Sequence, residues 1–252
     1  MFKLALAQMR VEGGQSERNL ARAVERIDEA ADGGADLVLL PEAMDLGWTD
    51  EACRSAAQPI PEGTPCRILM ETAARRGIHV CAGLTEAGDG AVYNAAVLID
   101  RSGRLRLTHR KINELDIATS CYTPGRRIEV ADTEFGSVGL MICADGFAES
   151  EAIGRARGAM GAGLILSPCA WAVEAGCAEP YGDLWRSVYR PVAESYGLWI
   201  AAVSNVGPMT SGPWAGRSCI GHSMVFDPSG RDVLTGPYGE DADALLWVNL
   251  EI

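Results

Sequence analysis

The sequence predicts an α/β fold in which helices cover mixed sheets. Strand-like and helix-like patterns alternate along almost all of the 252 residues, the order typical of sheets covered by helices. Apolar runs at 78–84, 91–99 and 105–109 follow one another at hairpin spacing, so neighbouring strands there should be antiparallel. No linker, charge block or short repeat interrupts this pattern. We therefore expect a single domain over residues 1–252.

Apolar patterning separates strands from helices in the first half of the chain. The predicted strands span residues 2–8, 36–40, 78–84, 91–99 and 105–109. Apolar residues at helical spacing predict helices over 16–31 and 64–76. Ser16 is the expected N-cap of the first helix, Gly33 is its stop, and Gly77 ends the second helix.

The second half continues the alternation. The predicted strands span residues 128–130, 137–142, 164–166, 198–203, 220–226 and 244–248. The predicted helices span residues 149–158 and 181–196. We expect the loops 43–63, 112–124 and 171–183 to shape any binding pocket, because loops at strand ends carry function in such folds.

Charge and composition exclude several classes of partner. The chain has 34 acidic and 22 basic residues, a formal net charge of −12, and an acidic chain repels phosphate backbones and anionic lipid. Neither nucleic acid nor a membrane is therefore an expected partner. Residues 1–9 carry one lysine and no cleavage signal, and no apolar stretch continues for ~20 residues. We expect a cytoplasmic protein.

The eight cysteines follow neither a metal-binding nor a redox pattern. No C-x-x-C pair occurs, which excludes zinc ribbons and thioredoxin-like sites, and most of the cysteines are expected to be small buried hydrophobes. The chain also lacks a G-x-x-x-x-G-K-[ST] loop, a G-x-S-x-G elbow and H-E-x-x-H spacing. The phosphate-cradling loop is excluded in this way, as is a common serine-hydrolase arrangement, and no histidine pair has the spacing of a metal site.

Reactive side chains follow several apolar strands, where α/β folds usually place function. Glu42 comes directly after a strand and Pro41, and partial burial would suit this carboxylate to proton transfer. A turn cap is the alternative. Lysine is rare, with only Lys3 and Lys111 among the 22 basic residues, and Lys111 follows the strand 105–109. A lysine in an arginine-rich chain suggests that a compact ammonium is needed there, the alternative being a surface charge.

Cys143 ends the apolar run 137–142, and a predicted helix begins soon after it. Such a turn would expose the sulfur and aim backbone N–H groups at it, and with a nearby cation these would lower the pKa of the thiol. A core cysteine is the alternative. We expect Asp145 to support the turn by accepting hydrogen bonds from backbone N–H groups. The alternative is an ordinary turn aspartate without such a role.

The strand-end segments together resemble one family. Leu40-Pro41-Glu42, Arg110-Lys111 and Ile142-Cys143-Ala144-Asp145 are similar to the Glu, Lys and Cys motifs of the nitrilase superfamily, the carbon–nitrogen hydrolases. Their order fits, with 69 residues from Glu42 to Lys111 and 32 from Lys111 to Cys143. Further similarity covers residues 5–8, 166–171, 204–205 and 221–230, so the resemblance extends over nearly the whole chain.

The resemblance implies a mechanism, a fold and an assembly. Cys143 would attack the carbonyl or nitrile carbon, and Glu42 would move the protons. Lys111 and the backbone N–H of Ala144 would hold the oxyanion. The mechanism requires no metal and no organic cofactor. The family fold is a four-layer α-β-β-α sandwich with two mixed sheets, and its members usually pair through a helical face, so we expect a homodimer or higher homo-oligomer.

Departures from the family pattern narrow the substrate. Many family amidases carry a second glutamate near the position of Ala118, where this chain offers Glu114 or Asp116 instead. The arginine that many members have after the cysteine motif is absent, which disfavours N-carbamoyl amino acids. Trp48 and Trp171 follow strand ends and would bind substrate or pack in the core.

We therefore predict a cysteine-dependent hydrolase that cleaves the non-peptide C–N bond of a small linear amide and releases ammonia from a thioester. Nitriles and N-carbamoyl compounds are weaker candidates. One alternative is acyl or amide transfer from the same thioester, and another is a catalytically silent relative that binds a metabolite. A Cys–His site using His109 or His222 is disfavoured because no feature orients either imidazole toward Cys143.

Overall fold

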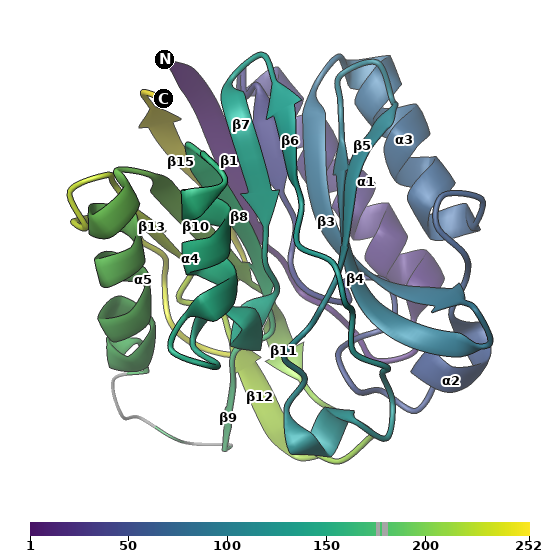
Figure 1. Cartoon of the computed structure of the whole chain (residues 1–252). Coiled ribbons are helices and arrows are strands. Elements are labelled where there is room, and N and C mark those ends of the chain that lie inside the picture. The colour runs from purple at the N-terminus through teal and green to yellow at the C-terminus, as the bar shows by residue number, and fades with distance from the viewer. Residues whose placement is uncertain (175–176, 178–180) are drawn as a thin grey trace.

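Two six-stranded sheets face each other at the centre of the protein (Figure 1). The computed structural model describes residues 1–174, 177 and 181–252. The first sheet has the order β15 (Ala244–Leu250), β1 (Phe2–Gln8), β2 (Leu37–Leu39), β3 (His79–Gly88), β4 (Ala91–Ile99) and β5 (Leu105–Arg110). The second has the order β14 (Asp232–Thr235), β13 (Met224–Phe226), β10 (Trp199–Ser204), β8 (Leu164–Cys169), β7 (Gly136–Leu140) and β6 (Val130–Thr133).

Both sheets are mixed, as predicted. In the first, β1, β2 and β3 are parallel, while β15, β4 and β5 join them as antiparallel neighbours. In the second, β7, β8 and β10 are parallel, with antiparallel strands at either side. Because the last strand, β15, pairs with the first, β1, the two termini lie close together at one end of the sandwich.

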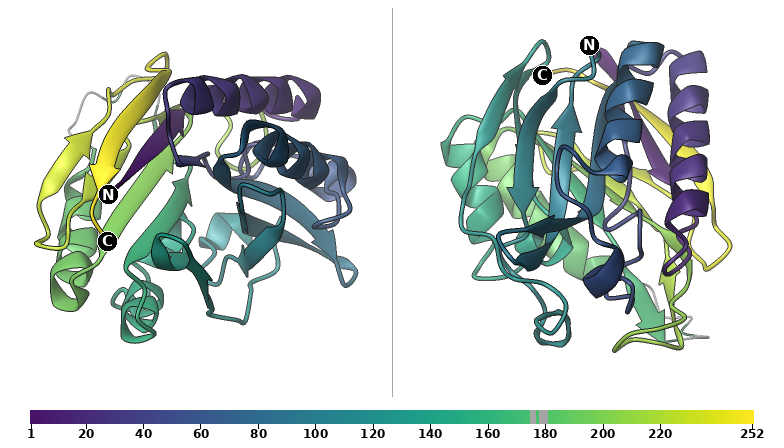
Figure 2. Two further views of the ribbon diagram at one scale, coloured as in Figure 1. Left: turned by 90° about the horizontal axis from the view of Figure 1, so that it is seen from above. Right: turned by 90° about the vertical axis from the view of Figure 1, so that its right-hand side faces the viewer.

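Alternate residues of each central strand enter different cores. Leu4 and Leu6 of β1 point into the apolar core between the sheets, whereas Ala5 and Ala7 point to the opposite face. On that outer face lie α1 (Ser16–Asp32) and α3 (Thr64–Arg76). The second sheet likewise carries α4 (Ala152–Ala159) and α5 (Asp183–Tyr196) on its outer face. The four-layer α-β-β-α sandwich is thus confirmed (Figure 2).

The helix predicted over 64–76 and its stop at Gly77 are confirmed, but three helix starts differ from expectation. The helix expected over 181–196 begins at Asp183. Ser16 is the first residue of α1 rather than its N-cap; Gln15 is the cap, without a side-chain hydrogen bond. The helix expected from residue 149 begins only at Ala152, because residues 149–151 all have positive φ angles of 50° to 57°. A right-handed helix cannot include such residues.

A third, three-stranded sheet was not predicted. It has the order β11 (Val206–Pro208), β12 (Arg217–Ile220) and β9 (Ala172–Glu174) and extends beyond the ends of β8 and β10. The run 220–226, expected as one strand, is divided between β12 and β13 because His222 takes a φ of 61°. Such short strands, one containing Gly207 and Pro208, lack the length that patterning needs.

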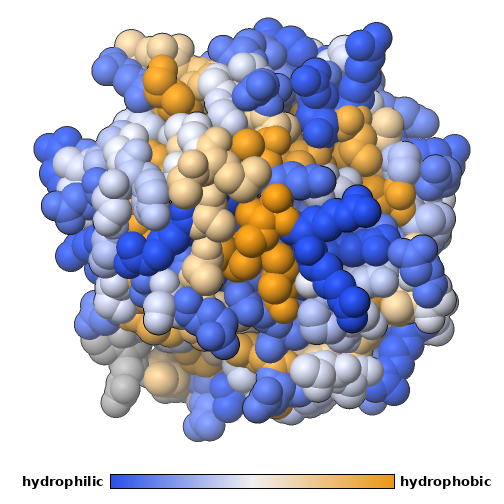
Figure 3. Space-filling view, in the orientation of Figure 1, coloured by the Kyte–Doolittle hydropathy of each residue, from blue (hydrophilic) through white to orange (hydrophobic). Residues whose placement is uncertain are grey.

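The face of the molecule that carries α4 and α5 is largely hydrophilic, with apolar side chains gathered near its centre beside α4 (Figure 3). Within the described residues, no helix combines the length and apolar character needed to cross a membrane.

Candidate active site

Glu42 follows β2 through Pro41 in a turn that packs tightly against β3. At Gly83 of β3 an added Cβ would lie 2.5 Å from the Glu42 Cα atom, so this approach requires glycine. Glu42 Oε1 accepts hydrogen bonds from Asn94 Nδ2 and Lys111 Nζ, each at 2.7 Å. Glu42 Oε2 has no hydrogen-bond partner among the described residues, although the side chain is fully buried. One carboxylate oxygen is therefore anchored and the other is free to take a proton.

Lys111 follows β5 directly, and its side chain is fully buried. Its Nζ atom lies 2.7 Å from Glu42 Oε1, 3.7 Å from Glu114 Oε2 and 5.5 Å from the centroid of the Trp48 ring. Burial alone would lower the pKa of Lys111. The charges of Glu42 and Glu114 raise it by more than burial lowers it, so the pKa lies above its ordinary value. Lys111 is thus a permanent cation at the site.

Cys143 is the first residue of the 3₁₀ turn η2 (Cys143–Gly146) and has a φ of 43°. A non-glycine residue in this left-handed region costs roughly 1–2 kcal/mol, and such cost is typical of functional sites. The residue is partly exposed, so it is not sealed inside the core. The electrostatic influence of both Glu42 and Lys111 reaches the sulfur. The structure therefore brings the three predicted side chains together.

The prediction that the turn lowers the pKa of the Cys143 thiol is wrong for the resting protein. The neighbouring Cys169 thiol, burial and the Glu42 carboxylate raise the pKa of the Cys143 thiol well above its ordinary value, and Lys111 only partly offsets them. A helix terminus after Cys143 would lower this pKa, but η2 has only four residues and cannot supply a macrodipole. Cys143 rests as a thiol, so nucleophilic attack requires a base.

Asp145 fixes the main chain on both sides of the site, which extends its predicted role. Its Oδ1 atom accepts hydrogen bonds from the backbone N–H groups of Ile112 at 3.1 Å and Asn113 at 2.9 Å, the two residues that follow Lys111. Its Oδ2 atom accepts the N–H of Ile142 at 3.1 Å, just before Cys143. One buried carboxylate therefore connects the lysine and cysteine segments, which belong to different sheets.

Of the two acidic candidates for a second glutamate, the structure places Glu114 at the site. Its side chain is 1% exposed and contacts Lys111, whereas Asp116 is exposed at the start of η1 (Asp116–Ala118). Burial and the charge of Glu42 raise the pKa of Glu114 to about 8, against the effect of Lys111. Neither carboxyl oxygen of Glu114 has a hydrogen-bond partner in the described part of the chain.

The two candidate tryptophans lie in different surroundings. Trp48 lies beside Lys111 and packs edge-to-face on Trp214, with ring centroids 5.1 Å apart. Trp171 stacks on Trp185 in the outer core of the second sheet at 4.7 Å. Trp48 therefore borders the site directly, while Trp171 is held by its stacking partner.

Sequence reasoning missed several residues of the site. Asn94 lies in the middle of β4, and Trp214 lies in a loop before β12, so neither follows the strand-end pattern. An apolar group, here called the mouth cluster, includes Trp48, whose ring lies beside the Lys111 ammonium. It comprises Ala43, Trp48, Cys53, Ala118, Tyr122, Ala170, Ala172 and Cys219, with Trp214 and Met209 packed on it. These residues come from four distant segments, and no sequence spacing could have joined them. The third predicted pocket loop, 171–183, includes residues 175–176 and 178–180, which are outside the described residues.

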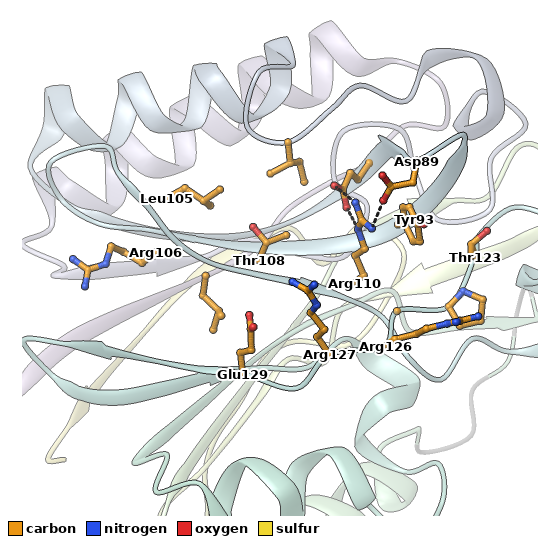
Figure 4. A pocket seen from close by; sticks show the side chains of 15 residues that line it. Asp89, Tyr93, Leu105, Arg106, Thr108, Arg110, Thr123, Arg126, Arg127 and Glu129 are labelled. Carbon is orange, nitrogen blue, oxygen red and sulfur yellow. Dashed lines mark hydrogen bonds and ion pairs between the residues drawn. The ribbon is translucent and has the colours of Figure 1, made fainter.

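A large pocket lies apart from these residues. It has a volume of about 810 Å³ and runs between β5 and residues 123–129 (Figure 4). Arg110 forms a two-pronged contact with Glu86 at 2.7 and 2.8 Å, contacts Asp89 at 3.2 Å and lies over the Tyr93 ring. None of Glu42, Lys111 and Cys143 lines this pocket.

The three histidines belong to different segments of the chain. His79 lies in β3, His109 in β5 and His222 before β13. Among the described residues, no group of three or more His, Cys, Asp or Glu side chains is arranged to hold a metal ion.

A thiol, a carboxylate and an ammonium that meet at the strand ends of a four-layer sandwich define the class of cysteine hydrolases with a Glu–Lys–Cys site. The sequence model of the carbon–nitrogen hydrolases matches residues 3–251, and the chain belongs to that family of enzymes.

Curated relatives agree with this membership, and a solved structure has a similar fold. The chain is 30% identical to the omega-amidase NIT2 of Danio rerio over 241 residues, covering 91% of this chain and 82% of that protein. It is also 30% identical to an (R)-stereoselective amidase of Pseudomonas sp. over 231 residues, or 91% and 79% of the two chains. The fold is similar to that of an amidase from Nesterenkonia sp., with a TM-score of 0.85 and 23% identity over 99% of this chain and 90% of that one.

Proposed function

We propose that this protein hydrolyses small linear amides to the acid and ammonia through a thioester on Cys143. The observation that carries the proposal is the buried Glu42–Lys111 pair near Cys143, a residue that is not fully buried. Glu42 Oε2 has no hydrogen-bond partner in the part of the chain that the structure describes. A raised thiol pKa fits this assignment, because the adjacent carboxylate can remove the proton as the sulfur attacks.

The first half of the proposed reaction forms the thioester. Cys143 Sγ attacks the amide carbon while Glu42 takes the thiol proton. The carbonyl oxygen becomes an oxyanion, for which Lys111 Nζ and the Ala144 N–H are the proposed donors. Glu42 then gives its proton to the nitrogen, the C–N bond breaks, and ammonia leaves.

The second half releases the acid. Glu42 takes a proton from a water molecule as that water attacks the thioester carbon, and the same donors stabilise the second oxyanion. The C–S bond breaks, and the proton returns from Glu42 to the sulfur. The enzyme regains its thiol, and the products are one carboxylic acid and one ammonia for each amide and water consumed.

The surroundings of Lys111 support an uncharged, partly apolar acyl group as substrate. The mouth cluster supplies the apolar wall, and Trp48 and Glu114 are the proposed substrate contacts, with Trp171 a more distant candidate. Since Glu114 has a pKa of about 8, it is mostly neutral near pH 7. The relatives support an amide: structures of the Nesterenkonia amidase hold butyramide, or carry the acetamide moiety of fluoroacetamide on the active-site cysteine.

The proposal is tested by ammonia release from acetamide, butyramide, butyronitrile and N-carbamoylalanine, with the wild-type protein and Cys143→Ala. We expect turnover of the amides above the nitrile and carbamoyl compound, and none by Cys143→Ala. Turnover retained by Cys143→Ala would refute the thioester. Adding hydroxylamine separates the acyl-transfer alternative: a hydrolase gives mainly acid, whereas a transferase gives hydroxamate and little acid. A silent binding relative would turn over none of these compounds.

Membership of the carbon–nitrogen hydrolase family also supports three further proposals: a single domain over residues 1–252, a homodimer and a cytoplasmic location. The α4–α5 side exposes Met160, Leu184 and Tyr196, each more than a third exposed, which supports pairing through this helical face. All eight cysteines are free thiols in the described structure, which favours a reducing compartment. Light scattering of wild type and Leu184→Glu tests the pairing, and an unchanged mass for the variant would contradict it.

A further inference from the structure

A buried histidine and a buried arginine lie behind the site, and the proposed chemistry uses neither of them. His109 is in β5, two residues before Lys111, and Arg157 is in α4; they are 3% and 0% exposed. His109 Nε2 lies 2.7 Å from Asp145 Oδ2, and Arg157 Nη2 lies 3.0 Å from His109 Nδ1. The three side chains form one line from the outer helix to the residues that flank Lys111 and Cys143.

The chemistry of Arg157 and His109 determines which imidazole nitrogen of His109 carries the proton. A guanidinium only donates, so His109 Nδ1 must be the acceptor of the Arg157 bond. The proton of a neutral imidazole is then on Nε2, which donates it to Asp145. A neutral ring agrees with the environment, because burial lowers the pKa of His109 although Asp145 opposes this effect.

Arg157 is an expensive residue to bury. No carboxylate lies within ion-pair distance of it among the described residues, and its Nε has no hydrogen-bond partner there. Burial lowers the pKa of Arg157 to about 10, with Asp145 as the opposing charge. Gly139 of β7 makes room for it, since a Cβ there would lie 2.5 Å from Arg157 Cδ. A buried cation without a direct counter-ion costs stability, so its retention calls for a benefit elsewhere.

We propose that His109 and Arg157 are positioning residues that act through Asp145 to hold the Lys111 and Cys143 segments in register. The inference rests on the proposed hydrolase function. Asp145 accepts three backbone N–H groups from the two segments, and His109 occupies its remaining hydrogen-bonding position. The imidazole restrains the carboxylate, and Arg157 restrains the imidazole and keeps it in the required tautomer.

The variants His109→Leu and Arg157→Met keep side-chain volume and remove the polar line. We expect kcat per titrated Cys143 to fall about 10- to 100-fold, with KM within about threefold, because a small misplacement of reacting groups costs rate more than binding. His109→Gln preserves a donor at the Nε2 position and should recover most of the activity. Hydrogen exchange at the Ile112 and Asn113 amides should accelerate in His109→Leu and return toward the wild-type rate in His109→Gln.

His79 provides a matched control. It is equally buried, in β3, but its Nε2 atom faces Glu134 at 3.1 Å, away from the site. His79→Leu should lower the thermal unfolding temperature without changing kcat per titrated cysteine. Asp145→Asn should lower kcat, and adding His109→Leu to it should lower kcat no further, because both changes act through one carboxylate.

Unchanged kcat in His109→Leu and Arg157→Met would overturn the inference, as would fully additive losses in the double variant. If His109→Leu does not fold, Arg157→Met decides by the same criterion. Failure of the proposed function is recognised separately, since ammonia release by Cys143→Ala would refute the thioester whatever the histidine variants do.

Discussion

Arg110 and Lys111 are adjacent at the end of β5, yet one faces a large pocket and the other faces the candidate active site. The two places differ in whether their charged groups have hydrogen-bond partners. Arg110 faces the 810 Å³ pocket, and Glu86 and Asp89 satisfy its guanidinium. Lys111 faces the buried site, where Glu42 Oε2 and both oxygens of Glu114 have no hydrogen-bond partner in the described structure. Buried polar atoms without hydrogen bonds cost stability, and three of them gathered beside one buried lysine point to a functional site, which the volume of the other pocket does not.

The largest expected effect is at Lys111. We expect Lys111→Arg to lower kcat/KM for butyramide by roughly 10²–10³-fold, because a planar guanidinium cannot replace a compact donor in a fully buried space. The measurement is steady-state ammonia release at saturating and limiting amide. A variant within threefold of the wild type would mean that Lys111 does not hold the oxyanion.

The next effect is at Asn94, whose amide fixes Glu42 Oε1 at 2.7 Å. We expect Asn94→Ala to lower kcat about tenfold, because the proton-transfer group loses one of two restraints. Asn19→Ala is the control: Asn19 is equally buried, in α1, and donates to the Glu12 and Asp45 carbonyls. The control should lose stability but keep kcat, and an equal loss of kcat in both variants would contradict the prediction.

A smaller, pH-dependent effect is expected at Glu114. With a pKa of about 8, this carboxyl gains a negative charge as pH rises through 8 and then opposes the developing oxyanion. We expect wild-type kcat/KM to fall a few-fold over this range and Glu114→Gln to remain flat. Asp116→Asn, at the exposed position, should keep the wild-type profile. The same falling limb in Glu114→Gln would assign the titration to another group.

The smallest effect is expected on the other side of the comparison. Arg110→Lys keeps the charge opposite Glu86 and Asp89, so we expect kcat/KM within about twofold of the wild type and little change in stability. Kinetics and thermal unfolding measured beside Lys111→Arg check this. A loss comparable to that of Lys111→Arg would show that the large pocket is coupled to the chemistry.

Site residues that follow directly after a strand could be predicted from the sequence. Site residues that reach the site only through contacts between distant segments could not. Glu42, Lys111 and Cys143 each follow an apolar strand, and such positions can be read from patterning and motifs. Asn94 and Trp214 reach the site only because sheet pairing and loop packing place them there.

The error about Cys143 has the same origin. Its pKa depends on Cys169, on burial and on how the charge of Lys111 is shared with two carboxylates, none of which can be read from local sequence. The boundaries of two elements were mispredicted because of backbone angles that local sequence does not reveal. Positive φ values delay the start of α4 and divide the predicted strand 220–226.

The central claim is that Cys143 carries the acyl group, and acid quenching during the first turnover of butyramide tests it most directly. We predict that mass spectrometry finds a butyryl group on the peptide that contains Cys143, formed together with the first equivalent of ammonia and absent from Cys143→Ala. An acyl group on another residue, or ammonia released by Cys143→Ala at the wild-type rate, would contradict the account.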